Sequence, residues 1–140
     1  MHHQASRYSQ GDHFRYQFSV YLPANWEVDT RESVDIFWQF KRFEGGPDIF
    51  IAVKGRDIVL RSNGLNNRRQ DPLIYDYKAG KWYDFRFDIL WSTRTEGQLK
   101  AFVKSGDEKD YSEVLSFSGA NIQNEKENSA YLKWGIYKPD

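Results

Sequence analysis

The stretch Phe14-Arg15-Tyr16-Gln17-Phe18-Ser19-Val20-Tyr21-Leu22 alternates between apolar side chains and side chains that are mostly polar. Successive side chains of an extended chain point to opposite faces, so this period of two predicts a β-strand with one buried face. An amphipathic helix would instead need apolar residues three and four positions apart. The same alternation returns in residues 34–43 and 82–91, which predicts a protein built mainly from strands.

Turns rich in Gly and Pro separate these strands at short intervals, for example at Pro23-Ala24-Asn25 and Glu44-Gly45-Gly46-Pro47. Short strands with turn signals about 8–12 residues apart are typical of a β-sandwich or jelly roll. We therefore predict an all-β, concanavalin A-like sandwich. A chain of 140 residues has room for one core, so a single domain is expected over residues 14–138, after an N-terminal tail at residues 1–13.

Finer expectations concern individual segments. Residues 49–53 and 58–61 should form a hairpin around a Lys-Gly-Arg-Asp turn. Residues 62–72 are rich in Asn and Arg and are predicted to be a polar loop. Alternation in residues 34–43 predicts an apolar face and an opposite face. The first comprises Val34, Ile36, Trp38 and Phe40, and the second comprises Phe37, Gln39 and Lys41.

Charge and composition limit the classes of ligand that the chain is expected to bind. The 20 basic and 20 acidic residues cancel, so a global attraction to nucleic acid is not expected, and an acidic polymer would need a local basic patch. Aromatic residues make up 17% of the chain. They fit sugar stacking in a groove and also the ordinary preference of sheets for aromatic rings.

Several other functional classes lack their sequence signals. There is no Cys for a disulfide framework. No apolar run is long enough to span a membrane, and no metal or cofactor motif is present. The start, Met1-His2-His3-Gln4, has no signal-peptide core. Either an upstream export segment was removed, which would give the secreted or periplasmic location that we expect, or the protein stays inside.

The final predicted strand, Tyr131-Leu132-Lys133-Trp134-Gly135-Ile136-Tyr137, carries the most chemistry. Alternation puts Tyr131, Lys133 and Tyr137 on one face, and Gly135 leaves a gap between them where a ligand can approach the backbone. A strand with one ordinary solvated face would give the same pattern, so the residues alone leave both interpretations open.

This Tyr-x-Lys-x-Gly-x-Tyr strand resembles the signature strand of the jelly-roll polysaccharide lyases, a superfamily that includes heparin lyase I, glucuronan lyases and the jelly-roll alginate lyases. Three further segments resemble motifs of the same group in the same order. They are residues 16–23 followed by Trp26, residues 36–41 in place of a Gln-x-His strand, and residues 82–91 followed by Ser92 and Gly97. The resemblance spans roughly residues 14–138.

The resemblance implies a lyase that cleaves a uronic-acid polymer, such as alginate, glucuronan or a glycosaminoglycan, by β-elimination without a cofactor. Tyr137 matches the catalytic tyrosine, which can act as base and acid when cationic neighbours lower its proton affinity. Lys133 matches the lysine of that strand, and Gln39 matches the glutamine that hydrogen-bonds the uronate carboxylate. Tyr131 is expected to line the substrate subsites.

Two departures from the family pattern leave alternatives open. Lys41 stands where the family has histidine; it could neutralise the carboxylate or act as a base, or it could mark a glycan-binding module without catalysis. The family's Arg-x-Glu strand and closing strand are also missing, so Arg15, Arg42 and Arg86 are the candidates to replace the arginine. Missing terminal strands would leave open sheet edges, which predicts a homodimer.

A competing motif is the Glu-x-Asp-x-x-Glu pattern of Glu27-Val28-Asp29-Thr30-Arg31-Glu32. It matches the spacing of retaining β-glucanases, in which one carboxylate attacks the sugar and another protonates the leaving oxygen. Its polar flanks after a turn favour a charged loop instead. His13, which lies just before the first strand, is interpreted as a surface residue.

Overall fold

The computed structural model describes residues 7–27, 34–42, 45–123 and 130–137. All regular secondary structure in these ranges is β, and they contain no helix long and apolar enough to cross a membrane. The strands are β1 (Arg7–Tyr8), β2 (His13–Leu22), β3 (Asp35–Arg42), β4 (Pro47–Lys54), β5 (Asp57–Gly64), β6 (Asn67–Ile74), β7 (Lys81–Leu90), β8 (Gln98–Ser105), β9 (Ser112–Ser118) and β10 (Ala130–Tyr137).

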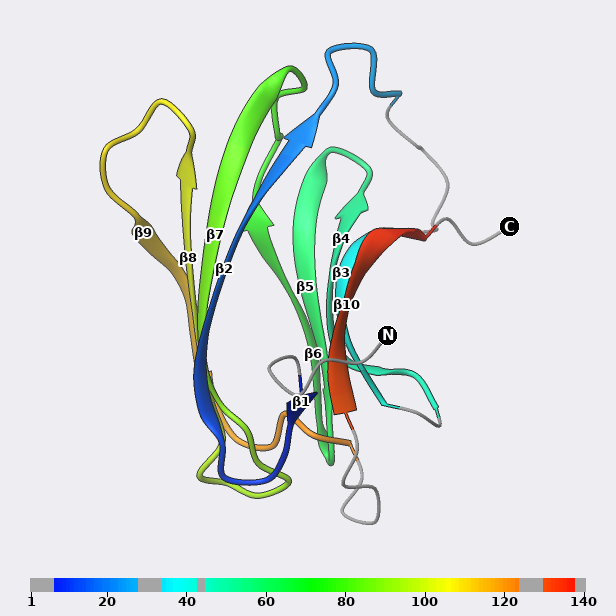
Figure 1. Ribbon diagram of the computed structural model, residues 1–140, viewed down its shortest axis with the longest axis vertical. Helices are drawn as coiled ribbons and strands as arrows, with labels where there is room; N and C mark the ends of the chain where they lie inside the picture. Colours follow the sequence, from blue (N-terminus) through cyan, green and yellow to red (C-terminus); the bar gives the residue numbers. More distant parts are fainter. Residues whose placement is uncertain (1–6, 28–33, 43–44, 124–129, 138–140) are drawn as a thin grey trace.

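The strands form two antiparallel sheets that pack face to face (Figure 1). Sheet A has the strand order β1-β10-β3-β4-β5-β6, and sheet B has the order β2-β7-β8-β9. The last strand of the chain, β10, therefore lies beside β3, although about ninety residues separate them in sequence. The predicted all-β sandwich is confirmed.

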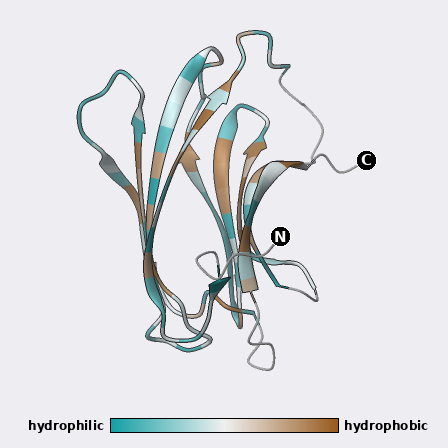
Figure 2. Cartoon of the chain, in the orientation of Figure 1, coloured by the Kyte–Doolittle hydropathy of each residue, from teal (hydrophilic) through white to brown (hydrophobic). Residues whose placement is uncertain are grey.

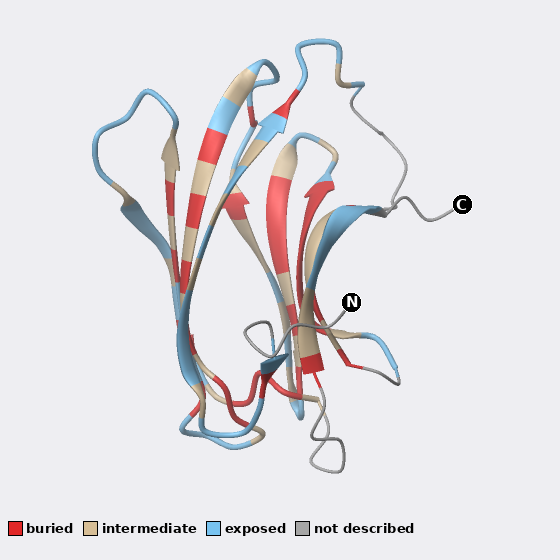
Figure 3. Ribbon diagram, in the orientation of Figure 1, coloured by how far each residue is buried: buried red, intermediate tan, exposed pale blue. Residues whose placement is uncertain are grey.

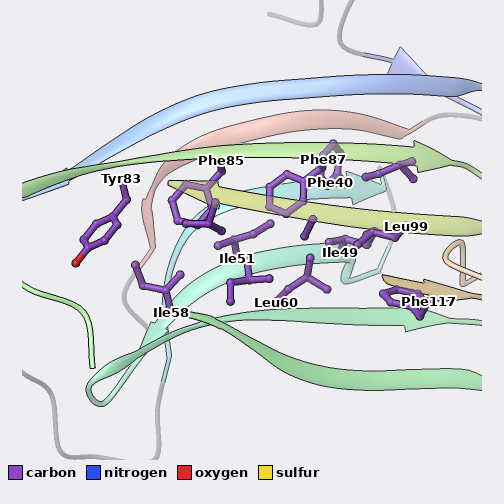
Figure 4. Close-up of a cluster of buried hydrophobic side chains, with 14 of the residues drawn as sticks. Phe40, Ile49, Ile51, Ile58, Leu60, Tyr83, Phe85, Phe87, Leu99 and Phe117 are labelled. Carbon is purple, nitrogen blue, oxygen red and sulfur yellow. The ribbon is translucent and has the colours of Figure 1, made fainter. Parts of the chain in front are cut away.

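The main core lies between the sheets and comes from the alternating inward residues of both. Figure 4 shows Phe40, Ile49, Ile51 and Leu60 of sheet A close to Phe85 of sheet B. Buried positions alternate with more exposed ones along the central strands (Figure 3), and hydrophilic residues gather in loops such as the β8–β9 connection (Figure 2). The alternation that predicted the strands is thus the pattern that fills the core.

Residues 62–72, expected to be a polar loop, instead form the end of β5 and most of β6. The two strands join at Leu65-Asn66, where Asn66 has a φ of 54°, a left-handed conformation that Asn adopts more readily than most residues. The prediction of a loop was wrong because β6 lies at a sheet edge and carries polar residues on both faces, so it has no apolar alternation to reveal it.

The expected facing of residues 34–43 needs a correction in its first half. The β3–β4 pairing shifts register between Ile36 and Trp38, and such a bulge turns the residues before it to the other face. Ile36 therefore packs against a second apolar cluster on the other side of sheet A, while Phe37 packs on the main core. Phe40 stays inward as predicted.

The expected N-terminal tail is corrected as well, because residues 7–13 carry β1 and the start of β2. Tyr8 is buried, stacks on Trp91 with ring centroids 3.8 Å apart, and donates a 2.7 Å hydrogen bond to Asp48. Asp48 also accepts hydrogen bonds from Arg42 Nε at 3.1 Å and from the Gln123 backbone at 3.0 Å. One buried carboxylate therefore joins segments from distant parts of the chain, and the domain extends at least to Arg7.

Candidate functional site

The outer face of sheet A, which points away from the core, brings together four of the predicted site residues. Phe40 is fully buried in the core, so its neighbours Gln39 and Lys41 point to the opposite face of β3. In the β10–β3 ladder Lys133 lies opposite Gln39, and Tyr131 lies opposite Lys41. Residues paired across an antiparallel ladder share a face, so all four stand on the outer face of sheet A.

The strand register extends this group into a row that crosses the sheet. Gln39 lies opposite Phe50 on β4, Phe50 opposite Arg61 on β5, and Arg61 opposite Gln70 on β6. Together with Lys133 these residues form what we call the outer row: Lys133, Gln39, Phe50, Arg61 and Gln70. Neighbouring strands lie about 4.8 Å apart, so the row spans roughly 20 Å.

The outer row includes Phe50, which belongs to the second apolar cluster on this face of sheet A. Phe50, Ala52 and Val59 are nearly inaccessible although they do not face the main core. The guanidinium carbon of Arg61 lies 5.2 Å from the Phe50 ring centroid, a cation–π contact. The guanidinium Nη2 also donates a 2.7 Å hydrogen bond to Gln70 Oε1. These contacts hold the guanidinium of Arg61 over Phe50 and beside Gln70.

Positive charge predominates on this face in the part of the chain that the structure describes. Lys41, Lys133 and Arg61 all stand on it without a carboxylate partner among the described residues, and Arg68 lies opposite Asn63, two positions from Arg61 on β5. The acidic residue Asp57, at the start of β5, accepts a hydrogen bond from the Asp76 backbone at 3.0 Å. A chain with no net charge thus carries a local basic face.

Lys41 is held by a turn of its own chain. Its Nζ donates a hydrogen bond to the carbonyl oxygen of Gly45, and its side chain is only partly exposed. Lys133, in contrast, is exposed and has no hydrogen-bond partner among the described residues. Of the three donors of a lysine ammonium, Lys41 uses one on this carbonyl, whereas Lys133 has all three available among the described residues.

Tyr137 can be placed by register only. Its backbone pairs with Ile36, after a register shift between Trp134 and Tyr137, while its side chain lies outside the described residues. Gly135 sits within this shift at a φ of +134°, and a Cβ built there would meet no atom within 4 Å. The space around Gly135 is therefore open, and a side chain there would be strained by the backbone conformation.

The three arginines proposed to replace the family's arginine do not join this group. Arg42 is buried between the sheets and paired with Asp48 at 3.1 Å. Arg15 and Arg86 lie on sheet B; Arg15 pairs with Asp88 at 2.8 Å, and Arg86 covers the Phe102 ring at 3.9 Å. Alternation shows which side of a strand a residue faces but not which layer the strand joins, so sequence reasoning could not separate these arginines from the site.

Arg61 is the residue that sequence reasoning missed. The hairpin around residues 54–57 was predicted, and counting outward from its turn puts Phe50 opposite Arg61. That count, applied together with the alternation of β3, would have put Arg61 on the face of Gln39. The signal was therefore present but needed the order of strands in the sheet.

The competing carboxylate motif gains no support. Glu27 is exposed in the segment after β2, and Glu32 lies outside the described residues. His13 is exposed at the start of β2, opposite Leu90 on sheet B. The described ranges contain no cluster of His, Cys, Asp and Glu side chains suited to a metal ion.

A separate groove of about 480 Å³ opens between the sheets beside β2 and β10. Its lining is mostly apolar and includes Phe18, Trp38, Trp82, Trp134 and Ile136. Phe18 stacks on Trp38 at 3.8 Å, and Trp134 lies beyond Trp38 at 6.1 Å. Its described lining includes the carboxylate of Asp35 but no Lys, Arg or His that could neutralise a uronate, so the outer face of sheet A remains the candidate site.

These features define an all-β, jelly-roll protein with a basic outer face on one sheet. A family model described as polysaccharide lyase matches residues 2–140, and the chain belongs to this family. Its fold is similar to that of the endo-β-1,4-glucuronan lyase from the fungus Trichoderma reesei, with a TM-score of 0.76 over 93% of this chain and 19% sequence identity. The chain spans 58% of the length of that enzyme. No curated protein sequence matches it significantly.

Proposed function

We propose that this chain cleaves a uronic-acid-containing polysaccharide by β-elimination on the outer face of sheet A. The observation that carries the proposal is the pairing of Lys133 with Gln39 on one basic face that points away from the core. An ammonium and an amide side by side suit a carboxylate, because both donate hydrogen bonds to it and one neutralises its charge. The family of the chain and the glucuronan lyase named above are consistent with this substrate class.

In the proposed reaction Gln39 and Lys133 bind the carboxylate of the uronate whose C5 proton is removed. Neutralising that carboxylate makes the proton more acidic, because the developing negative charge is then stabilised. Tyr137 takes the C5 proton, the C4–O bond breaks as a C4=C5 double bond forms, and Tyr137 then gives that proton to the departing glycosidic oxygen. Tyr131, opposite Lys41, would contact an adjacent sugar.

The test is incubation with polyglucuronate, alginate and a glycosaminoglycan while following ultraviolet absorbance of the unsaturated product. We expect product from at least one polymer, and its loss in Tyr137→Phe, which removes only the hydroxyl. Absence of product from every uronate polymer across a wide pH range would contradict the proposal. Reducing sugar released without an unsaturated end would point to the glycosidase expected from Glu27 and Glu32 instead.

The second candidate is a glycan-binding module without catalysis, and one observation favours it. Lys41 stands where the family has histidine, and its ammonium already donates to the Gly45 carbonyl. A group bound in this way does not replace a histidine base. This candidate predicts polymer binding without turnover and an affinity that Tyr137→Phe leaves nearly intact, so the same variant distinguishes the two functions.

A homodimer through the edge of sheet A also remains a proposal. β1 pairs with β10 only at Tyr131 and Ala130, so the later part of β10 has no strand on that side among the described residues. Trp134 and Ile136 there are 69% and 64% exposed. Figure 3 shows a pale blue, exposed segment on β10. A single monomer mass by light scattering at high concentration would exclude the dimer. A polymeric substrate also favours the secreted or periplasmic location expected above.

A further inference from the structure

We propose that Arg61 binds the carboxylate of a second uronate, two sugar units along the polymer from the uronate that loses its proton. The inference rests on the proposed function and adds to it a contact that sets the minimum length of a good substrate. Nothing in the sequence motifs assigns a role to this arginine.

The first support is the position of Arg61. It stands in the outer row with Lys133 and Gln39, two strands away from Gln39 across β4. The separation of the two backbone positions is therefore roughly 10 Å. The residue between them, Phe50, is 5% exposed and lies beneath the Arg61 guanidinium, so no side chain rises between the two polar groups in this row.

The second support is that Arg61 is held in place and has hydrogen-bond donors to spare. The cation–π contact with Phe50 and the hydrogen bond to Gln70 hold the guanidinium in place. Of the five N–H donors of a guanidinium, the hydrogen bond to Gln70 uses one. Arg15, Arg42, Arg56, Arg69 and Arg86 each have an aspartate within 4.0 Å, whereas Arg61 has no acidic partner in the described ranges.

The third support is the shape of the substrate. One pyranose unit of an extended 1,4-linked chain is about as long as the distance between neighbouring strands. Successive units of such a chain turn over, so units two apart present their carboxylates to the same side. A polymer that crosses the strands with one carboxylate at Gln39 and Lys133 therefore brings the carboxylate two units away to the position of Arg61.

The chemistry fits the same assignment. A planar guanidinium binds a carboxylate through two parallel hydrogen bonds, which a lysine cannot do. Because the contact is remote from the bond that breaks, it strengthens the ground state and the transition state equally. Losing it should raise KM and leave kcat nearly unchanged.

The experiment compares the wild type with Arg61→Met, which keeps apolar cover over Phe50, and with Arg61→Lys, which keeps the charge. Arg15→Met on sheet B is the matched control for charge. Binding to and cleavage of β-1,4-linked glucuronate oligomers from disaccharide to hexasaccharide are measured separately, and thermal melting confirms that each variant is folded.

For oligomers long enough to reach both sites, we expect Arg61→Met to weaken binding and raise KM by about 10- to 100-fold. Arg61→Lys should lie between it and the wild type, while the shortest oligomers and the Arg15→Met variant should show no change. Equal affinities of wild type and Arg61→Met for the long oligomers would overturn the inference. Binding that depends on Arg61 without any cleavage would uphold the inference and refute the lyase reaction, and a wild type that binds no uronate oligomer would refute both.

Discussion

At the scale of single residues, Gln39 offers the sharpest test of the proposed site. It lies opposite Lys133 and has no hydrogen-bond partner among the described residues, so its amide is available to a substrate. We expect Gln39→Ala to lower kcat/KM on the preferred polymer by about 100-fold, because a donor to the carboxylate is lost in the transition state. Unfolding stability should change by no more than about 0.5 kcal/mol.

Gln17→Ala is the matched control for this variant. Gln17 is exposed on the outer face of sheet B, opposite Arg86, and should leave both kcat/KM and stability unchanged. Equal activity of Gln39→Ala and Gln17→Ala would contradict the placement of the site on sheet A. Initial rates from product absorbance, with denaturant unfolding alongside, decide between these outcomes.

The same residues show how far the sequence could predict the site. Alternation around Phe40 was enough to put Gln39 and Lys41 on one face, and the motif of the last strand supplied Lys133 and Tyr131. What alternation could not supply was the identity of the neighbouring strand, because strand order depends on contacts between distant segments. For that reason Arg61 was missed, and Arg15 and Arg86, which belong to the other sheet, were included.

At the scale of strands and turns, close backbone approaches fix where elements can pack. A Cβ at Gly97 would lie 2.3 Å from the carbonyl oxygen of Gly119, at the base of the β7–β8 connection. Because the added Cβ and the Gly119 carbonyl oxygen are both fixed to the backbone, the backbone itself would have to shift. We expect Gly97→Ala to lower the free energy of unfolding by about 1–3 kcal/mol, measured by urea denaturation.

Gly46 provides the control for this prediction. A Cβ there meets no atom within 4 Å, and its φ is not in the left-handed range. Gly46→Ala should therefore be neutral or slightly stabilising, since Ala has less freedom than Gly in the unfolded chain. If Gly97→Ala and Gly46→Ala lower the free energy of unfolding by the same amount, the packing argument is wrong.

Prediction at this scale succeeded where one face of a strand is buried and failed where none is. Apolar residues that fill the core, such as Phe18, Phe85 and Ile51, made β2, β7 and the start of the β4–β5 hairpin predictable. β6 does not, because polar residues such as Arg68 and Gln70 precede its first buried apolar residue, Leu73. β1 has only two residues, too few for any period, and its place depends on the contact of Tyr8 with Asp48, forty positions away.

At the scale of the whole molecule, buried phenols link stability to pH. Burial raises the pKa of Tyr8 well above its ordinary value of 10.0, and the neighbouring Asp48 carboxylate adds to the effect. Burial also raises the pKa of Tyr16, whose hydroxyl accepts a 2.9 Å hydrogen bond from Trp91 Nε1. Both groups keep their protons in the folded state at a pH where the unfolded chain has begun to lose them.

The sign of the effect follows from this difference. Above about pH 10 the folded state binds more protons than the unfolded state, so the free energy of unfolding falls as pH rises. The stabilisation is fully present below the unfolded pKa and is lost as pH rises toward the folded pKa. We expect denaturant-unfolding curves recorded between about pH 8 and about pH 11 to show this decline.

Tyr8→Phe isolates the contribution of one phenol. Near neutral pH it should lose about 1–3 kcal/mol, because Asp48 stays buried without one of its donors. Above about pH 10 its stability should fall less steeply than that of the wild type, because it has no Tyr8 proton to release. Tyr75→Phe, at a side chain that is 75% exposed, should follow the wild-type curve at every pH. If the free energies of unfolding of Tyr8→Phe and the wild type change in parallel with pH, Tyr8 keeps an ordinary pKa in the folded state. The buried Asp48 network that joins β1 to the sandwich would then not set the alkaline limit of the fold.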